Sequence, residues 1–282
     1  MRSHSEAGMC RLFRASVLGF ALLFAGFCGT AQAAVNCTAP DYNGSYAFYA
    51  SGYFLQLPSS AASLTGRFAQ SGTFTSNGLN TAVIQSTASY NGLIQSFNTT
   101  ATYTMNADCT LSFSLTLPPP LNIPATLQAV LSQNNGQMSA MITNPGGSTI
   151  ISTHVKQYIH FCTQTDLAGA YVIDLEGASP AVGSNPAGPF RRAGRLIADG
   201  AGKFTSNTLA NYSGQLARET FSGTYTLDAN CHLTLSYTSV SDGGATQNIA
   251  LSGDLAGAGY DAMMITTTPG WTVSGTLKAV QQ

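Results

Sequence analysis

This sequence has little charge. Asp, Glu, Lys and Arg make up 8% of its 282 residues, whereas a typical soluble protein contains about 25%. No basic patch of the kind that binds a phosphate backbone occurs, so we expect no nucleic-acid partner. The apolar fraction of 44% is high enough to build hydrophobic cores, so the low charge does not indicate disorder. Ser, Thr, Asn, Gln and Gly supply the polar surface instead.

The sequence is also poor in the residue types and motifs that carry catalysis. No GxSxG nucleophile motif is present, and after the N-terminal segment the histidines are His154, His160 and His232. No CxxC motif occurs and the cysteines lie far apart, which argues against a zinc site. We therefore expect no metal, no cofactor and no hydrolytic triad. The composition favours a binding protein over an enzyme.

Residues 1–33 have the features of a signal peptide. Arginines precede an apolar run over residues 15–27, and Ala31-Gln32-Ala33 offers the small-x-small pattern of a cleavage site. The run is too short for a permanent membrane anchor. Its removal takes away three arginines and one glutamate, which leaves 8 basic and 11 acidic residues and a net charge of −3. We expect an exported protein, periplasmic or extracellular, with no stable membrane insertion.

The rest of the chain contains one unit twice. Residues 103–113 (YTMNADCTLSF) match residues 225–235 (YTLDANCHLTL), and residues 37–46 match residues 162–171. GTFTSN at 72–77 also matches GKFTSN at 202–207, and Gly66-Arg67-Phe68 matches Gly194-Arg195-Leu196. Two copies indicate a duplication rather than a solenoid. We place the two modules at residues 34–158 and 159–282.

Within each module the hydrophobic period is two. Leu111, Phe113 and Leu115 alternate with Ser112 and Ser114, the pattern of a half-buried strand. Gly-containing turns separate about eight such strands per module, and no helix is predicted. The fold class is therefore all-β, with two tandem antiparallel up-and-down β-barrels of about eight strands each. Two β-sandwiches are the alternative, and we favour barrels because closure removes exposed strand edges.

The four cysteines that follow the N-terminal segment predict two disulfides. An even number of cysteines in an exported chain is typical of a disulfide framework. Each module has one cysteine before its first strand and one in its mid-module turn, so the repeat symmetry predicts Cys37–Cys109 and Cys162–Cys231. Each bridge would close a loop of about 70 residues, which stabilises the fold by roughly 4 kcal/mol.

The opening of each module resembles a known family. Gly44-Ser45-Tyr46 and Gly169-Ala170-Tyr171 are similar to the Gly-x-Trp start of calycin (lipocalin-like) barrels. Tyr stands where that family has Trp, and Trp271 lies near the other end of its module. In length and strand count the modules also resemble allene-oxide-cyclase-like barrels. Either resemblance implies an interior cavity for an apolar molecule, and neither carries over a catalytic residue.

Charged side chains provide the candidate ligand-binding residues: Asp174, Glu176, Arg191, Arg192, Arg195 and Arg67. Asp174 and Glu176 share a strand face opposite Tyr171. They are exposed to solvent if Tyr171 faces the core, and they form a site if a polar face lines a hollow barrel. Arg191 and Arg192 can receive a carboxylate or sulfate group, or they are solvated. The repeat aligns Arg195 with Arg67, which suggests a structural role for that pair.

Three further features are assigned by alternation and position. His154, Lys156, Tyr158 and His160 share one strand face, for which we expect a polar outer surface. His232 follows Cys231 in a turn, where we expect it to be solvated. Pro118-Pro119-Pro120 gives the first module a stiff apolar lip that the second lacks, either as a strand terminator or as part of an entrance or interface.

Together these features predict an exported two-module β-barrel protein that binds an apolar or amphipathic small molecule and catalyses no reaction. A structural or surface-interaction protein with solid cores is the first alternative. A cyclase- or isomerase-like enzyme is the second, because such an enzyme needs little beyond a shaped apolar pocket.

Overall fold

The computed structural model describes residues 36–132, 136–158, 161–241, 246–256 and 261–280, which belong to one compact unit. The signal peptide expected at residues 1–33 and the histidine at position 160 lie outside the described residues. Within the described residues, no helix is long and apolar enough to cross a membrane.

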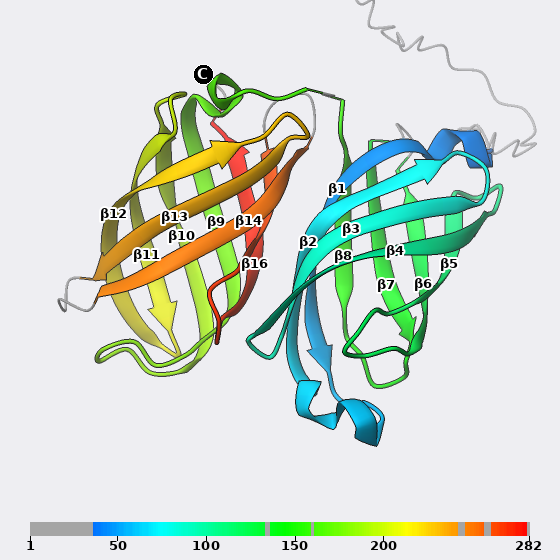
Figure 1. The fold of residues 1–282 in the computed structure, drawn as a ribbon, viewed down its shortest axis with the longest axis horizontal. Coiled ribbons are helices and arrows are strands. Elements are labelled where there is room, and N and C mark those ends of the chain that lie inside the picture. The colour runs from blue at the N-terminus through cyan, green and yellow to red at the C-terminus, as the bar shows by residue number, and fades with distance from the viewer. Residues whose placement is uncertain (1–35, 133–135, 159–160, 242–245, 257–260, 281–282) are drawn as a thin grey trace, which may run out of the picture. The chain divides into compact units, whose positions relative to one another are not determined.

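The strands form two closed antiparallel barrels of eight strands each, in tandem along the chain (Figure 1). Each strand pairs with its sequence neighbours, and the last strand of each barrel pairs with the first. The first barrel contains β1 (Asn43–Phe54), β2 (Gly66–Asn77), β3 (Thr81–Tyr90), β4 (Leu93–Met105), β5 (Thr110–Thr116), β6 (Pro124–Leu131), β7 (Gln137–Asn144) and β8 (Ile151–Lys156). The second contains β9 (Gly169–Ser179), β10 (Gly188–Ala198), β11 (Lys203–Tyr212), β12 (Gln215–Leu227), β13 (His232–Ser241), β14 (Thr246–Ala256), β15 (Asp261–Thr266) and β16 (Thr272–Ala279). The barrel prediction is confirmed, and the sandwich alternative is excluded by the closing strand pairs.

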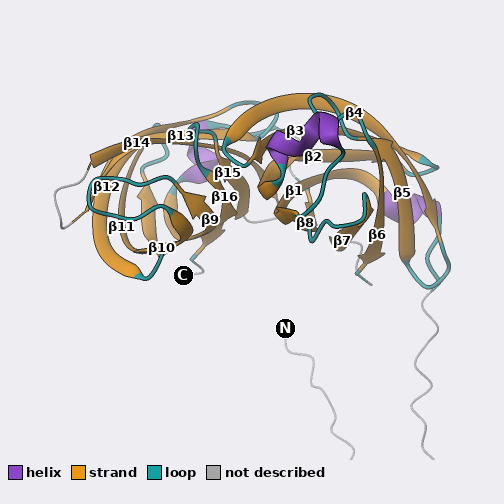
Figure 2. Ribbon diagram, turned by 90° about the horizontal axis from the view of Figure 1, so that it is seen from below, coloured by secondary structure: helices purple, strands orange, loops and turns teal. Residues whose placement is uncertain are grey.

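Short 3-10 helices lie before or between strands, near the barrel ends (Figure 2): η1 (Ala39–Tyr42), η2 (Ser59–Leu64) and η3 (Gln164–Leu167). η1 and η3 occupy the same place in the two barrels and begin with the same capping box, in which an Asp side chain accepts from the backbone N–H of the preceding Thr. Tyr42 at the end of η1 is fully buried and packs against Tyr46 and Tyr103. Leu167 at the end of η3 is likewise fully buried in the core of the second barrel.

Both predicted disulfides are confirmed. Cys37 is bonded to Cys109 and Cys162 to Cys231, with a Cα–Cα distance of 5.0 Å in each case. Each bridge ties the segment that precedes the first strand of a barrel to the turn between its fourth and fifth strands. The sequence separations of 72 and 69 residues are nearly equal, so the duplicated unit carries its own bridge.

Strand register defines which residues of the two barrels are equivalent. Tyr46 on β1 pairs with Phe74 on β2, and Tyr171 on β9 pairs with Leu196 on β10. By the same reasoning β3 corresponds to β11, β4 to β12 and β5 to β13, with a difference of 122 in residue number. The sequence match of residues 72–77 with 202–207 is therefore wrong as a structural alignment, because the first segment ends β2 and the second lies at the start of β11.

The same correction applies to the two arginines that the sequence aligned. Position 67 is equivalent to Pro189, so Arg67 and Arg195 do not share a place in the fold. The misalignment arose because neighbouring strands carry the same alternation of Phe with Ser and Thr. Counted between equivalent positions, the connection between the first two strands is longer in the first barrel, where it includes η2, and the connection between β5 and β6 is shorter than its counterpart between β13 and β14.

The alternation of side chains places one face of every strand inside its barrel. The second barrel has a single continuous core. The first barrel has two separate clusters of buried side chains: one is centred on Tyr42, Phe74 and Phe113, and the other on Phe54 and Tyr90. The interior of the first barrel is therefore divided between its two ends.

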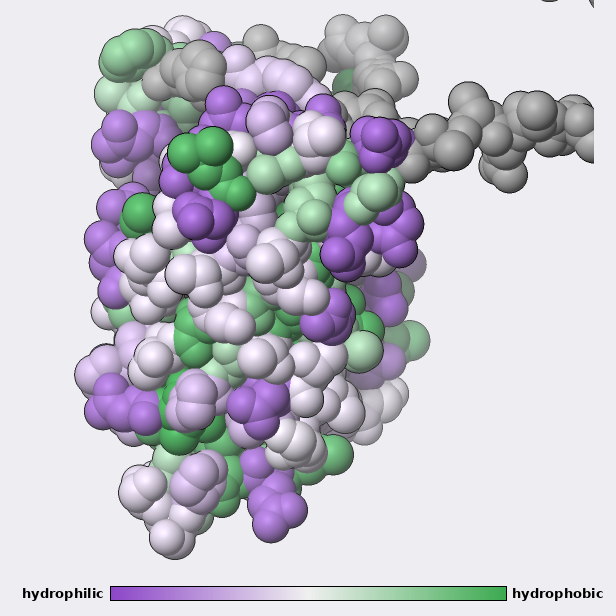
Figure 3. Space-filling view, turned by 90° about the vertical axis from the view of Figure 1, so that its right-hand side faces the viewer, coloured by the Kyte–Doolittle hydropathy of each residue, from purple (hydrophilic) through white to green (hydrophobic). Residues whose placement is uncertain are grey.

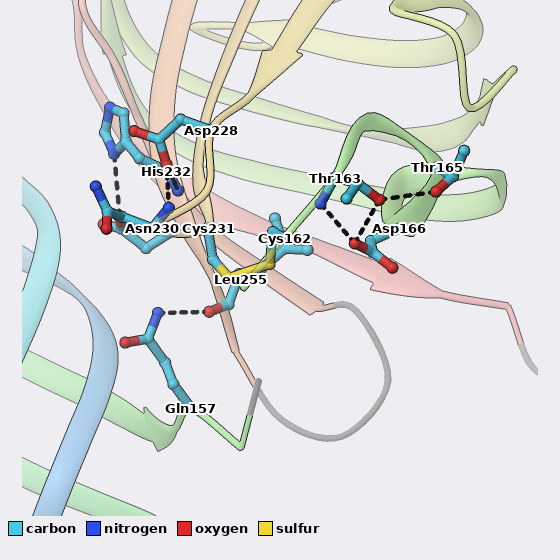
Figure 4. The surroundings of a disulfide bond; sticks show 11 residues. Gln157, Cys162, Thr163, Thr165, Asp166, Asp228, Asn230, Cys231, His232 and Leu255 are labelled. Carbon is cyan, nitrogen blue, oxygen red and sulfur yellow. Dashed lines mark hydrogen bonds and ion pairs between the residues drawn. A yellow bond between two sulfur atoms is a disulfide. The ribbon is translucent and has the colours of Figure 1, made fainter. Parts of the chain in front are cut away.

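Outer faces of the two barrels contact each other. Ala47 on β1 packs with Ala256 and Met263 on β14 and β15, and the Ser71 hydroxyl donates to the Met263 carbonyl at 2.7 Å. Gln157 donates from its side-chain amide to the Leu255 carbonyl at 2.8 Å, next to the Cys162–Cys231 bridge (Figure 4). Elsewhere the surface follows the composition: Figure 3 shows a face with many pale residues of intermediate hydropathy, among scattered hydrophilic and apolar ones.

Candidate functional site in the first barrel

The interior of the first barrel contains a cavity between its two core clusters. Its volume is about 50 Å³. Its walls are mostly apolar and include side chains from both clusters, among them Phe48, Phe74, Phe97, Phe113, Leu115, Leu117, Ile142 and Ile150. These residues come from β1, β2, β4, β5 and β7, from the segment after β5 and from the residue before β8. The cavity is therefore part of the barrel interior and not a groove on the surface.

The wall of the barrel is incomplete beside this cavity. β4 pairs with β3 along nearly its whole length, but with β5 only from Ala101 to Met105. In the second barrel the equivalent pairing of β12 with β13 extends to Glu219. β5 ends at Thr116, two residues before Pro118, and proline has no backbone N–H to extend a strand ladder.

Side chains at this split are half-buried although they point inward. Phe97 and Thr99 on β4 are both partly exposed and both line the cavity. The Thr99 hydroxyl donates to the Thr116 carbonyl at 3.3 Å, a contact that bridges the two separating strands. The triple proline therefore ends β5, and the cavity reaches the surface between β4 and β5.

Polar groups lie at the opposite wall of the cavity, on β8 and β2. Ser152 lines the cavity, and its hydroxyl lies 2.9 Å from Nε2 of His154. His154 is buried and stacks on Phe48, with ring centroids 5.0 Å apart. Gln70 donates to the Ser86 hydroxyl at 2.9 Å. A ligand in the cavity would meet a mainly apolar wall with a few hydroxyl and amide groups.

The environment of His154 keeps it neutral. Burial lowers the pKa of His154 from 6.5 to about 3, because a charged imidazolium would lose its hydration without gaining a carboxylate partner. The expectation of a polar outer face is wrong for this residue. Since His154 pairs in register with Phe48 on β1, and Phe48 faces inward, the alternation of β8 turns His154 inward as well.

The second barrel is filled at the equivalent level by a buried ion pair. Arg192 on β10 donates to Glu219 on β12, and each side chain is 1% exposed. Tyr212 donates to the second oxygen of Glu219 at 2.6 Å, and Arg192 also donates to the Tyr237 hydroxyl at 2.5 Å. The rings of Phe190, Phe221 and Tyr237 surround the guanidinium group within 6 Å.

Equivalent positions explain how the second barrel fills the level at which the first has its cavity. Register places Gln70 where the second barrel has Arg192, Phe97 where it has Glu219, and Leu115 where it has Tyr237. All three residues of the first barrel line the cavity. The ion-pair network thus occupies in the second barrel the place that is open in the first.

The structure separates the six candidate ligand-binding residues. Tyr171 faces the core, so Asp174 and Glu176 point outward, and Arg191 forms an ion pair with Asp174 at 3.2 Å. Arg195 is exposed. In the first barrel Arg67 donates to the Tyr53 hydroxyl at 2.8 Å. Arg192 lies inside a barrel, where Glu219 neutralises it.

The residues that line the cavity were not singled out in the sequence. Phe97, Leu115 and Leu117 have the alternation of ordinary core residues, and alternation does not distinguish a filled interior from an open one. The one signal that pointed to this place was the triple proline at residues 118–120. Its position fixed where the strand ends, and therefore where the wall opens.

Among the residues that the structure describes, no group of three or more His, Cys, Asp or Glu side chains could hold a metal ion. Comparisons with models of protein families and with curated proteins gave no match.

Proposed function

We propose that the protein binds a small apolar molecule, or the end of an apolar chain, inside the first barrel. The observation that carries the proposal is the contrast between the two barrels. At equivalent positions one interior is filled by a buried ion pair, whereas the other has an apolar cavity beside a split in its wall. The second barrel shows that the same fold can fill this level of its interior with side chains, so the fold does not require the cavity of the first barrel.

The size of the cavity limits the ligand. Its volume of about 50 Å³ is larger than the roughly 30 Å³ share of one water molecule, but far below the roughly 300–1,000 Å³ of sites that enclose drug-sized molecules. The ligand is therefore a molecule of a few heavy atoms, or a longer one that inserts only its tail between β4 and β5. A carbonyl or hydroxyl group on the ligand can pair with Ser152.

The second barrel has a structural role in this proposal. Its interior holds one continuous hydrophobic core, and its outer face contacts the first barrel through Ala256 and Met263. The chain would therefore combine one binding module with one supporting module.

Export and family resemblance belong to the same proposal. Two disulfides favour an oxidising compartment, and the N-terminal segment has signal-peptide features, so we propose a periplasmic or extracellular protein. The closed eight-stranded barrel with an interior cavity supports a calycin-like mode of binding in the first module. Detection of the processed chain, beginning near Ala34, in the exported fraction tests this part.

Filling the cavity tests the binding site. Thr99→Phe copies the residue that the equivalent position of the second barrel carries, Phe221, and should close the opening. Thr100→Phe, on the exposed face of the same strand, is the matched control. Native mass spectrometry and thermal shift against short-chain alcohols, small aromatics and fatty acids measure binding.

We expect at least one apolar probe to raise the Tm of the wild type and of Thr100→Phe. No probe should raise the Tm of Thr99→Phe. The proposal fails if no probe binds the wild type, or if Thr99→Phe binds as well as the control.

A further inference from the structure

Three side chains on the outer face of the second barrel form a hydrogen-bonded relay. The Ser252 hydroxyl lies 3.0 Å from Nε2 of His232, and Nδ1 of His232 lies 3.0 Å from a carboxylate oxygen of Asp254. Ser252 and Asp254 are two residues apart on β14, so they share a face, and His232 on β13 pairs directly with Asp254. The serine, the imidazole and the carboxylate are thus connected in the order of a hydrolytic triad.

The carboxylate determines which imidazole nitrogen carries the proton. An ionised Asp254 only accepts hydrogen bonds, so Nδ1 of His232 is the donor and Nε2 is left as the acceptor for Ser252. Asp254 is buried, with 6% of its side chain exposed, whereas the His232 side chain is 42% exposed. The relay therefore runs from a buried acid to an imidazole that solvent reaches.

The turn before β13 holds the imidazole in place. Asp228 accepts from the backbone N–H groups of Asn230 and His232, at 2.8 and 2.9 Å. The Cys162–Cys231 bridge anchors the residue immediately before His232 (Figure 4). Because the backbone at His232 is fixed on both counts, its ring keeps its position between Asp254 and Ser252.

The fold itself does not require these residues. In the first barrel, register places Thr110, Gln128 and Val130 at the positions of His232, Ser252 and Asp254. That barrel closes in the same way without any of the three side chains. The relay is therefore an addition to the second module.

The relay opens into a polar groove of about 710 Å³. Its other walls come largely from the first barrel and carry hydroxyl and amide groups, such as Ser71, Thr73, Gln85 and Asn98. The charged or titratable groups that line it are Asp228, His232 and Asp254, and no lysine or arginine does. The groove therefore suits an uncharged, hydrogen-bonding substrate rather than an anion.

We propose that Ser252, His232 and Asp254 form a hydrolytic site for small, uncharged carboxylic esters. In the first step the Ser252 oxygen bonds to the carbonyl carbon of the ester while its proton passes to Nε2 of His232. His232 then gives this proton to the departing alkoxide, which leaves as the alcohol. Water attacks the resulting acyl-serine by the same proton route, releases the carboxylic acid and restores Ser252. Asp254 stabilises the imidazolium in both steps.

The titration of His232 gives the reaction a pH dependence. The hydrogen bond to Asp254, opposed by partial burial, raises the pKa of His232 above 6.5, and Asp228 acts in the same direction. The residues that face it from the first barrel are not titratable. Since only neutral imidazole accepts the serine proton, hydrolysis should rise as pH increases through this pKa.

The test uses the full-length chain expressed for export. Hydrolysis of p-nitrophenyl acetate is followed for the wild type, Ser252→Ala and Asp254→Asn, with Ser236→Ala as the control. Ser236 lies on the outer face of β13, is exposed and opposes Ala250. A fluorophosphonate probe is added to the wild type, and the labelled residue is located by peptide mass spectrometry.

The expected result is labelling of Ser252, at least a tenfold loss of hydrolysis in Ser252→Ala and Asp254→Asn, and wild-type hydrolysis in Ser236→Ala. The proposal is overturned if the probe does not label Ser252, or if folded Ser252→Ala hydrolyses the ester as fast as the wild type. Labelling needs no variant, so the test remains decisive if a substitution prevents folding. Trp271 fluorescence checks that each variant is folded.

Discussion

The buried ion pair of the second barrel makes a quantitative prediction. Glu219→Gln keeps the shape of the side chain but removes the charge that neutralises Arg192, which cannot lose its own proton in a protein. Both side chains are 1% exposed, so water does not replace the lost carboxylate. Breaking a buried pair in this way costs about 3–5 kcal/mol of unfolding free energy. For a module of about 120 residues, this lowers Tm by roughly 12–20 °C.

The assay can be confined to the second barrel. Trp271, the single tryptophan of the chain, packs edge-on against Phe190 at 5.2 Å, and Phe190 is one of the rings around Arg192. Tryptophan fluorescence during urea unfolding therefore reports on this module, even if the two barrels unfold in separate steps. Glu176→Gln, at an exposed position of the same barrel, is the matched control and should change stability by less than about 0.5 kcal/mol.

A double variant separates the cost of an uncompensated charge from the worth of the pair. Arg192→Met with Glu219→Leu removes both charges and keeps apolar volume, so it should be less destabilised than Glu219→Gln alone. The reasoning is refuted if Glu219→Gln costs less than about 1 kcal/mol, or if the double variant is the less stable of the two.

Three further predictions concern stability. Burial lowers the pKa of His154 to about 3, well below its ordinary 6.5. Between these two pH values the unfolded chain binds a proton at His154 and the folded protein does not, so the free energy of unfolding falls as pH drops from 6.5 towards 3. Between pH 7.5 and 4.5 the wild type should therefore lose about 2–3 kcal/mol more than His154→Phe in urea titrations; equal losses would contradict this. Replacing Cys37 and Cys109 by Ser should lower the free energy of unfolding by about 4 kcal/mol. A loss below about 1 kcal/mol would contradict the idea that the bridge restricts the unfolded chain. In Gly194→Ala the new Cβ would lie 2.3 Å from the Asn207 carbonyl oxygen, so we expect a loss of about 1–3 kcal/mol, measurable as a lower urea midpoint.

Local patterns were reliable where one physical rule acted alone. The alternation of Leu111, Phe113 and Leu115 determined which face lies inside, because a strand turns successive side chains to opposite faces. The prediction for His154 failed although the same rule applied, because the polar character of its neighbours suggested an outward face. Its register with Phe48 turns it inward, and that register depends on closure of the barrel by β8.

Arg192 illustrates the limit for the candidate site. Next to Arg191 in sequence it has the appearance of a surface cluster, yet alternation on β10 places one arginine outside and the other in the core. Its buried position is tolerated because Glu219, 27 residues away, meets it there. Ser252 and His232 are 20 residues apart, and no local pattern marked them as neighbours.

The amino-acid pattern was sufficient to predict the duplicated all-β architecture and the pairing of the cysteines, because periodicity, turn residues and repeat symmetry are local or internally repeated. The position of the cavity emerged only from the packed barrels, since the same alternation encodes a filled interior and an incompletely filled one. Tertiary packing also determines which polar side chains meet. Volume and proximity depend on the register of strands far apart in the chain, and a one-residue change in that register would turn each of these side chains to the other face.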